Sequence, residues 1–370
     1  MSLSSLLKNN SELRKSIPDI KSSIVALDGS TFNWKMPILV PSIGASHEAG
    51  LIGTAFDYVA RAILAQTLER SSVTMEESLI AEKALDLIIN FRGIPTLPQH
   101  FEYGVMFCGD NLKCAKYDDL DDDRQSIPFI DFVSLTLPGF KKYSLKMFVE
   151  ALQKRNCFIE TGSGLDDLIE SSILFAEFDT IYRTQTIPAF LAAMDHFWQD
   201  IYGTTLVKPM ITHIEMVKNI KTLAQVFQTA ISNISPETCK LNPSFGKYST
   251  MVGGADADFI IDDIIVDIKT NKKLGYKNEN FAQLLAYAAM GRKIGMKLNR
   301  ASIYYARYGE FSVIDLDPLE SFLEQYLTNI ESITQKSINM KSDLRAKFGK
   351  KELDNNTLIK PYNLYNSQHH

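Results

Sequence analysis

Residues 253–288 constrain the fold of this chain more than any other part of the sequence. Around and within them, apolar and polar residues alternate with a period of two, which predicts strands over 249–261 and 264–270. Asp262 and Asp263 lie between these strands, and aspartate is common in tight turns. We therefore expect a β-hairpin with a two-residue turn, followed by a helix.

A hairpin with that turn places charged side chains opposite one another. In its register Asp258 faces Asp267, and Asp256 faces Lys269. Directly opposed side chains share one face, so three carboxylates and one ammonium group converge on a small surface. Burying such a cluster beside apolar residues is costly unless the charge is compensated, and a divalent cation is the natural compensator.

These residues suit metal-dependent cleavage of a phosphodiester. Aspartates on neighbouring strands supply anionic oxygens for Mg²⁺ or Mn²⁺, with Asp258 and Asp267 as expected ligands and Asp256 as a further candidate. Lys269 lies two residues beyond Asp267 on the same face, and we expect it to position the attacking water or to stabilise phosphate charge. The choice between Asp256 and Asp258 as the first acid depends on the inferred turn.

The tripeptide Asp-x-Lys is not specific by itself, because Asp19-Ile20-Lys21 is a second copy. That copy has neither a facing acidic strand nor a following helix with the pattern Gln-x-x-x-Tyr, so we treat it as unrelated to the site. The alternative for the hairpin itself is a surface position, in which Asp256 and Lys269 form a salt bridge that contributes little stability.

A helix predicted over 280–294 carries Gln283 and Tyr287, which are four residues apart and so lie on one face. Their amide and phenol groups suit hydrogen bonds to a phosphate, a base or a metal-bound water. The alternative is structural, with Tyr287 in an amphipathic core and Gln283 in a local network.

Basic residues are concentrated just after the second strand. Eight basic residues and one acidic residue lie from Lys269 through Arg300. Such a local excess suits contacts with phosphates of DNA, and RNA is not excluded, because these contacts hold a backbone without reading its sequence. The expected contacts are Lys272, Lys273, Lys277, Arg292 and Lys293. A solvated basic helix face is the alternative.

Composition argues against several classes of protein. The chain of 370 residues has a formal net charge of -5 and a pI of about 5.8, so it lacks a global basic field. Its four cysteines include no CxxC pair, and we expect no zinc. No apolar run approaches the roughly 18 residues that span a bilayer, and no signal peptide is recognisable, so we expect a cytoplasmic protein without a membrane partner.

The order of helices and strands predicts an α/β fold with a large, mainly helical region. The expected segments are 1–46, an N-terminal segment; 47–238, mainly helical; 239–317, the α/β core; and 318–370, a C-terminal helix and polar tail. Helices are predicted over 53–70, 75–91, 145–153, 165–182, 188–202 and 211–232, and a further strand over 301–308. An irregular region over 109–138 includes the acidic stretch 118–123, which we expect to be a solvated loop.

Taken together, the pattern resembles the PD-(D/E)xK nuclease superfamily, and within it the RecB-type branch. The family has an acidic residue on one strand, Asp/Glu-x-Lys on the next, and then a helix with Gln and Tyr. The matching residues here are Asp258, Asp267, Lys269, Gln283 and Tyr287. The resemblance implies a restriction-endonuclease-like core, a mixed sheet flanked by helices, and a Mg²⁺-dependent nuclease that acts on DNA.

RecB-type nucleases also carry an upstream helix of the form Gly-Thr-x-x-His, whose histidine joins the metal site. Gly53-Thr54-Ala55-Phe56-Asp57 is similar, with aspartate in place of histidine, and this implies Asp57 as a further ligand. Some relatives hold an iron–sulfur cluster through three cysteines downstream of the core, and none is expected here because no cysteine follows Cys239. The alternative function is a nucleic-acid-binding or assembly protein that keeps the fold without cleavage.

Overall fold

The computed structural model describes residues 3–44, 46–68, 73–75, 79–90, 103–108, 111–116, 126–127, 129–184, 213–234 and 236–348. The chain forms two compact units. The first comprises Met1–Glu77, Gln153–Ile173 and Met210–Met340, and the second comprises Ser78–Leu152, Leu174–Pro209 and Lys341–His370. Two long helices, α5 (Phe129–Thr161) and α6 (Leu165–Thr184), contribute residues to both units.

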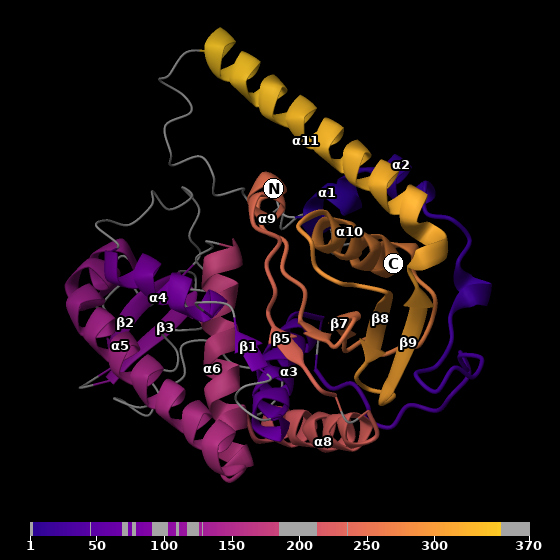
Figure 1. Ribbon diagram of the computed structural model, residues 1–370. Helices are drawn as coiled ribbons and strands as arrows, with labels where there is room; N and C mark the ends of the chain where they lie inside the picture. Colours follow the sequence, from indigo (N-terminus) through magenta and orange to yellow (C-terminus); the bar gives the residue numbers. More distant parts are fainter. Residues whose placement is uncertain are drawn as a thin grey trace, which may run out of the picture. The chain divides into compact units, whose positions relative to one another are not determined.

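A six-stranded mixed sheet forms the centre of the first unit (Figure 1). Its strands, in spatial order, are β1 (Val73–Met75), β5 (Cys239–Leu241), β6 (Phe259–Ile261), β7 (Ile264–Lys269), β8 (Arg300–Tyr305) and β9 (Glu310–Asp315). The pairs β1–β5 and β7–β8 are parallel, and the other neighbours are antiparallel. Helix α10 (Asn278–Lys293) provides the crossover that the parallel pair β7–β8 requires.

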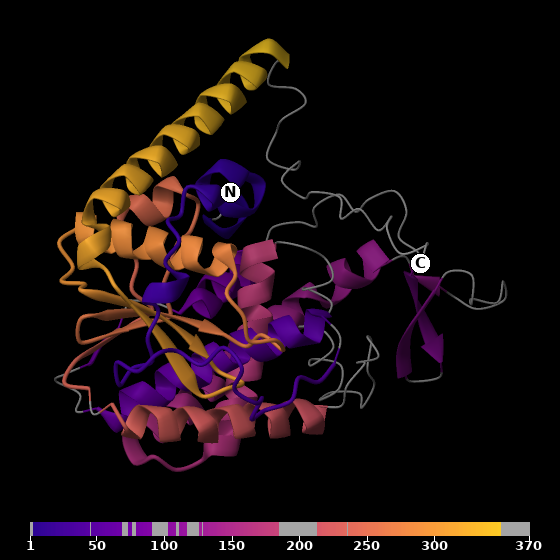
Figure 2. The same cartoon turned by 90° about the vertical axis from the view of Figure 1, so that its right-hand side faces the viewer.

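Helices cover both faces of this sheet (Figures 1 and 2). On one face lie α10, α1 (Leu3–Asn9) and the first part of α11 (Glu320–Phe348). On the other face lie α3 (Ser46–Thr67) and α8 (His213–Ser232). The short helices are α2 (Ser11–Lys15), α9 (Lys247–Met251) and the 3₁₀ turns η1 (Lys21–Ser23) and η4 (Asp317–Leu319).

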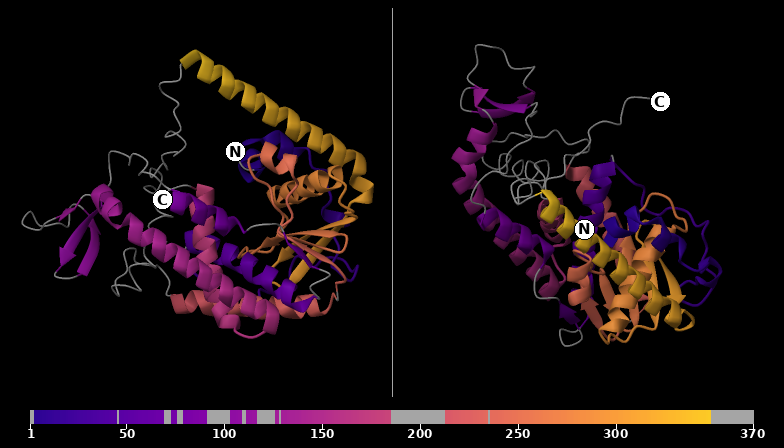
Figure 3. Two further views of the ribbon diagram at one scale, coloured as in Figure 1. Left: turned by 60° about the vertical axis from the view of Figure 1, so that its left-hand side comes forward. Right: turned by 90° about the horizontal axis from the view of Figure 1, so that it is seen from above.

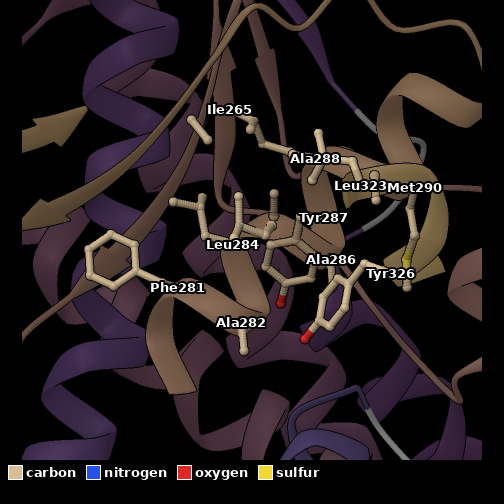
Figure 4. Close-up of a cluster of buried hydrophobic side chains, with 14 of the residues drawn as sticks. Ile265, Phe281, Ala282, Leu284, Ala286, Tyr287, Ala288, Met290, Leu323 and Tyr326 are labelled. Atoms are coloured by element: carbon tan, nitrogen blue, oxygen red, sulfur yellow. The ribbon is translucent and has the colours of Figure 1, made fainter. Parts of the chain in front are cut away.

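A large hydrophobic core lies on the α10 side of the sheet. Figure 4 shows Ile265 of β7 beside Leu284 and Tyr287 of α10, with Tyr326 of α11 nearby. Residues 281–291 of α10 are all buried except Gln283, which is half-buried. A helix that is apolar nearly all round must be enclosed, and here the sheet, α1 and α11 enclose it.

Aromatic rings fill the opposite face of the sheet. Phe227 of α8 packs against Tyr304 of β8, with ring centroids 5.1 Å apart, and against Phe259 of β6 at 6.1 Å. Phe56 of α3 meets Phe227 at 5.9 Å. Alternate residues of each strand therefore face the two helical layers, as the pleat of a strand requires.

The second unit combines helices with a small antiparallel sheet. That sheet has the order β3 (Asn111–Lys116), β2 (Tyr103–Cys108) and β4 (Ser126–Ile127), and Figure 3 draws β2 and β3 as purple arrows beside the start of α5. Helix α4 (Ile80–Asn90) also belongs to this unit. Phe148 of α5 packs against Phe175 and Phe178 of α6, with centroids 5.3 and 5.4 Å apart.

Strongly periodic segments have the predicted structure. The helices predicted over 53–70, 75–91, 145–153, 165–182, 211–232 and 280–294 correspond to α3, α4, part of α5, α6, α8 and α10, and the strands over 264–270 and 301–308 to β7 and β8. A mixed α/β architecture is therefore confirmed. The predicted helix over 188–202 and the acidic loop 118–123 lie outside the described residues.

Two predictions of secondary structure are wrong. Residues 249–258 are not a strand: α9 ends at Met251, and Gly253 and Gly254 then have φ angles of 76° and 113°, a region that an extended strand does not use. The region 109–138 is not uniformly irregular, because it holds β3, β4 and the start of α5. The two compact units also cut across the four expected segments. Among the described residues, no helix is long and apolar enough to cross a membrane.

Candidate metal-binding site

The hairpin of β6 and β7 has the register that its sequence predicts. Ile260 pairs with Ile265, and Asp262 has a φ of 50° in the turn, a left-handed conformation that aspartate tolerates. Counting two residues back from Ile260 and two residues forward from Ile265 places Asp258 opposite Asp267.

Asp258 lies just before β6 and reaches across to β7. Its Oδ2 accepts a hydrogen bond from the backbone N–H of Ile268 at 2.6 Å, while its carbonyl oxygen accepts one from the N–H of Asn242 at 3.0 Å. These bonds hold the half-buried carboxylate beside Asp267. Its other oxygen, Oδ1, receives no hydrogen bond from the described residues.

Asp267 and Lys269 occupy alternate positions of β7 and share the face toward α10. The Nζ atom of Lys269 is 2.6 Å from Oδ2 of Asp267. Asp267 is only 4% exposed, so its buried carboxylate depends on the Lys269 ammonium group for charge compensation. One ammonium group does not balance the two carboxylates of Asp267 and Asp258, and a cation bound between them would compensate the remaining charge.

Helix α10 holds Lys269 from the other side. Lys269 Nζ donates to Oε1 of Gln283 at 3.1 Å. The Gln283 amide nitrogen donates to the hydroxyl of Tyr287 at 2.7 Å and to Oγ of Ser4 at 3.2 Å. Because the lysine ammonium group can only donate, the carbonyl oxygen of the Gln283 amide faces it, and the amide nitrogen faces the two hydroxyl groups. The structure thus brings together Asp258, Asp267, Lys269, Gln283 and Tyr287.

Helix α3 adds a third carboxylate. Asp57 is half-buried, and the charges of Asp258 and Lys269 act on it. Gly53 precedes Asp57 by about one helical turn and lies against Thr270, the residue after Lys269: a Cβ atom on Gly53 would be 2.8 Å from the Thr270 Oγ1. The absence of a side chain at Gly53 therefore lets α3 approach the end of β7.

The charges in this group perturb one another. Burial raises the pKa of Asp57 well above its usual value, and the Asp258 carboxylate raises it further. Burial also raises the pKa of Asp267 to about 6, although the Lys269 ammonium group acts against it. Burial alone would lower the pKa of Lys269, but the carboxylates of Asp267, Asp258 and Asp57 together outweigh burial and raise it. The site carries an excess of negative charge, which a bound cation would relieve.

The hairpin pattern predicts Asp256 opposite Lys269, and the structure does not place it there. It forms an isolated bridge with Ser244 and does not continue the ladder opposite Lys269. Its carboxylate still contributes, after burial, Asp267 and Asp258, to raising the pKa of Tyr287. Asp256 therefore lies at the edge of the group, and Asp258 is the acid directly opposite Asp267.

The predicted phosphate contacts separate into two groups. Lys272, Lys273 and Lys277, in the segment between β7 and α10, are exposed, as is Lys293. None of their ammonium groups pairs with a residue in the part of the chain that the structure describes. Within the described part of the chain, these four ammonium groups are thus available to a ligand.

Arg292, unlike these lysines, is engaged in contacts within the protein. Its guanidinium group donates to the carbonyl oxygen of Leu298 at 2.7 Å and to the Asp317 carboxylate at 2.9 Å. Arg292 therefore joins the end of α10 to the segments on either side of the β8–β9 pair, and these contacts leave its guanidinium group less available to phosphates than the four lysines.

Two residues at the site escaped prediction. Ser4 is 279 positions from Gln283, and no local pattern marks it. Arg61 lies one turn after Asp57, with Nε donating to the Asp57 carbonyl oxygen at 3.1 Å and Nη1 donating to Asn242 Oδ1 at 2.8 Å. Its spacing of four residues from Asp57 was a usable signal, since such a pair lies on one helix face.

The donor set suits Mg²⁺ better than zinc. Within the described residues, no three His, Cys, Asp or Glu side chains are already gathered as a metal-holding group. Mg²⁺ needs only one or two carboxylates and keeps several waters, which Asp258 and Asp267 satisfy, with Asp57 close by.

Comparisons of the chain with protein-family models, with curated proteins and with solved structures find no match. Any assignment of function therefore depends on the residues and geometry of this site.

Proposed function

We propose that the first unit is a restriction-endonuclease-like core and that its carboxylate group binds Mg²⁺ or Mn²⁺ to hydrolyse phosphodiester bonds in DNA. The observation that carries the proposal is the convergence of Asp57, Asp258, Asp267 and Lys269 from α3 and the β6–β7 hairpin. The same chemistry extends to RNA, because phosphate and metal contacts do not by themselves distinguish the two.

The side chains have separate roles in this mechanism. Asp258 and Asp267 would hold the cation, and the charge of Asp57 on α3 would add to the attraction for it. When bound, the cation supplies a Lewis acid for the phosphate and lowers the pKa of a bound water. Lys269, held between Asp267 and Gln283, donates a hydrogen bond to the attacking water or to a phosphate oxygen.

The matched test compares Lys269→Met with Lys297→Met, which removes an exposed lysine of the same unit. Each protein is incubated with supercoiled, linear duplex and single-stranded DNA, with Mg²⁺, with Mn²⁺ or with a chelator. Cleavage is followed on gels. We expect Lys269→Met to cleave at least about 100-fold more slowly, the usual effect of removing a positioned proton donor, and Lys297→Met to behave as wild type.

Metal binding is measured separately by calorimetric titration of Mg²⁺. Asp267→Asn is expected to lose both binding and cleavage, whereas Lys269→Met is expected to bind Mg²⁺ and to lose cleavage only. Equal cleavage by Lys269→Met and wild type would refute the assigned roles. Binding of DNA without cleavage by the wild type would favour a nucleic-acid-binding protein.

A further inference from the structure

Two aromatic–lysine dipeptides that are far apart in the sequence meet beside the candidate metal site. Trp34-Lys35 precedes α3, and Tyr276-Lys277 lies between β7 and α10. The rings of Trp34 and Tyr276 have centroids 6.2 Å apart and planes at 80°. Both rings are half-buried and both lysines are exposed, so the pair presents aromatic surface and positive charge together.

Buried rings pack against both members of this aromatic pair. Tyr276 stacks on Phe281 of α10, with centroids 4.6 Å apart and planes at 17°. Trp34 packs against Phe32 at 4.6 Å and against Tyr305 at 6.1 Å. Rings held in this way lose little conformational freedom when a ligand binds, which favours affinity.

Tyr305 connects the aromatic pair to the metal-site residues. It is the direct partner of Lys269 in the β7–β8 ladder. Burial raises the pKa of Tyr305, and the Asp267 carboxylate raises it further, so the two side chains are electrostatic neighbours. A ligand lying on Trp34 and Tyr276 is therefore one strand away from the Asp267–Lys269 pair.

The charge around the aromatic pair is mostly positive. Lys272 and Lys273 lie in the same segment as Tyr276 and, like Lys35 and Lys277, are exposed and make no ion pair with the residues that the structure describes. The acid whose charge reaches Tyr276 is Asp19. Glu279, two residues after Lys277, is paired with Arg14, so four lysines against the Asp19 carboxylate leave a net positive surface, which suits a phosphate backbone.

We propose that Trp34, Tyr276 and the four lysines form a binding site for single-stranded nucleic acid, in which unpaired bases stack on the rings and the lysines contact phosphates. Every base has a face that stacks on an aromatic ring, so the site needs no particular sequence. In a duplex the bases already stack on one another, and their faces are not free. The inference rests on the proposed function only for what happens to the strand once it is bound.

The test measures binding by fluorescence anisotropy of a labelled oligothymidylate of about 20 nucleotides, which is longer than the roughly 4–16 nucleotides that one single-strand-binding fold covers. A duplex of the same length is the comparison, and divalent cations are omitted so that nothing is cleaved. We expect the wild type to prefer the single strand. Trp34→Ala and Tyr276→Ala should each weaken that binding roughly tenfold and leave duplex binding unchanged.

Two further variants serve as controls. Trp34→Phe keeps a ring and should retain most of the affinity. Phe322→Ala removes a half-buried ring of α11 that stacks on Tyr326 with centroids 5.1 Å apart, a setting similar to that of Tyr276, and should bind as wild type does. Thermal unfolding of each variant shows whether it is folded.

Unchanged single-strand affinity in folded Trp34→Ala and Tyr276→Ala, or equal affinity of the wild type for single strand and duplex, would overturn the inference. Cleavage assays separate this outcome from failure of the proposed function. Binding of the single strand through the two rings, without cleavage in Mg²⁺, supports the stacking site and contradicts the nuclease. Cleavage of single strands that is unaffected by Trp34→Ala supports the nuclease and contradicts the stacking site.

Discussion

A Cβ atom on Gly53 would lie 2.8 Å from Oγ1 of Thr270, a separation that real Cβ atoms do not show. Glycine is therefore what allows α3 to pack directly against the end of β7. Because Asp57 lies about one turn further along α3, this contact also sets how closely its carboxylate approaches the hairpin. The motif Gly53-Thr54-Ala55-Phe56-Asp57 thus has a packing role as well as an electrostatic one.

Gly53→Ala is expected to weaken Mg²⁺ binding several-fold, because the added methyl group pushes α3 away from Thr270. In an undisturbed helix the same change would stabilise the protein by about 0.5–1 kcal/mol. Thr270→Ala removes the clashing oxygen, so the double variant should recover most of the binding. We expect a coupling free energy of about 0.5–3 kcal/mol in a double-mutant cycle, measured by calorimetric Mg²⁺ titration.

Gly50→Ala is the matched control, since Gly50 is in the same helix and a Cβ atom there meets nothing within 4 Å. It should leave Mg²⁺ binding unchanged. Strictly additive effects of Gly53→Ala and Thr270→Ala would contradict the role of the contact.

Mg²⁺ binding should weaken as the pH falls through about 6. Burial raises the pKa of Asp267 to about 6 in the metal-free protein, against an ordinary value of 3.8, so protons compete with the cation below that pH. The stability of the metal-free protein depends on pH in the opposite direction. Asp267 binds its proton more readily in the folded state than in the unfolded chain. The contribution of Asp267 to stability is thus present below pH 3.8 and is lost as the pH rises through about 6.

The Mg²⁺-induced rise in melting temperature, measured at about pH 5 and pH 7.5, checks this expectation. The rise should be clearly larger at the higher pH. The Asp267→Asn protein should show no Mg²⁺-induced rise at either pH, because an amide neither titrates nor supplies the anionic oxygen that holds the cation. A rise of the same size at both pH values would show that Asp267 is not the competing group.

Ser4→Ala removes one of the two acceptors that orient the Gln283 amide. Because Ser4 is exposed, we expect the loss in unfolding free energy to be about 1 kcal/mol at most. The rate of cleavage should fall more than the affinity for Mg²⁺, since the displaced group holds Lys269 rather than a carboxylate. Ser11→Ala, an exposed serine at the start of α2, is the control. A fall in Mg²⁺ affinity equal to the fall in rate would argue against this chain of contacts.

The parts of the site that were predictable from sequence are those set by local rules. The alternation along β7 and the two-residue turn determine which residues face each other, so Asp258, Asp267 and Lys269 were placed correctly. The spacing of four between Gln283 and Tyr287 has the same local origin, and the two side chains are hydrogen-bonded. Side chains two residues apart on a strand, or four residues apart on a helix, share a face in almost any tertiary structure.

The remaining features depend on contacts between distant segments. Ser4 meets Gln283 because α1 packs on α10. Trp34 meets Tyr276 because the segment before α3 passes beside the segment between β7 and α10. Arg292 was expected to contact phosphates, but its position beside Leu298 becomes evident only once the chain has turned back after α10. Composition and periodicity carry no information about such pairs, since no local rule links their positions.

Arg307 offers a prediction that is independent of catalysis. It is completely buried after β8, and its Nε donates to the carbonyl oxygen of Thr270 at 2.8 Å. Its Nη1 donates to the carbonyl oxygen of Pro41 at 2.8 Å and to Oδ1 of Asn219 at 3.2 Å. One guanidinium group thus joins the end of β7, the segment before α3, and α8.

Arg307→Met is expected to lower the unfolding free energy by about 3 kcal/mol or more, because several buried acceptors lose their donor at once. Arg307→Lys should recover little, since a single ammonium group does not reproduce the planar fork of donors. Urea denaturation measures the change, with Lys297→Met as an exposed control expected to stay within about 0.5 kcal/mol of wild type. A loss below about 1 kcal/mol in Arg307→Met would mean that water or a shifted backbone replaces these bonds, and that Arg307 does not hold Thr270 beside Gly53.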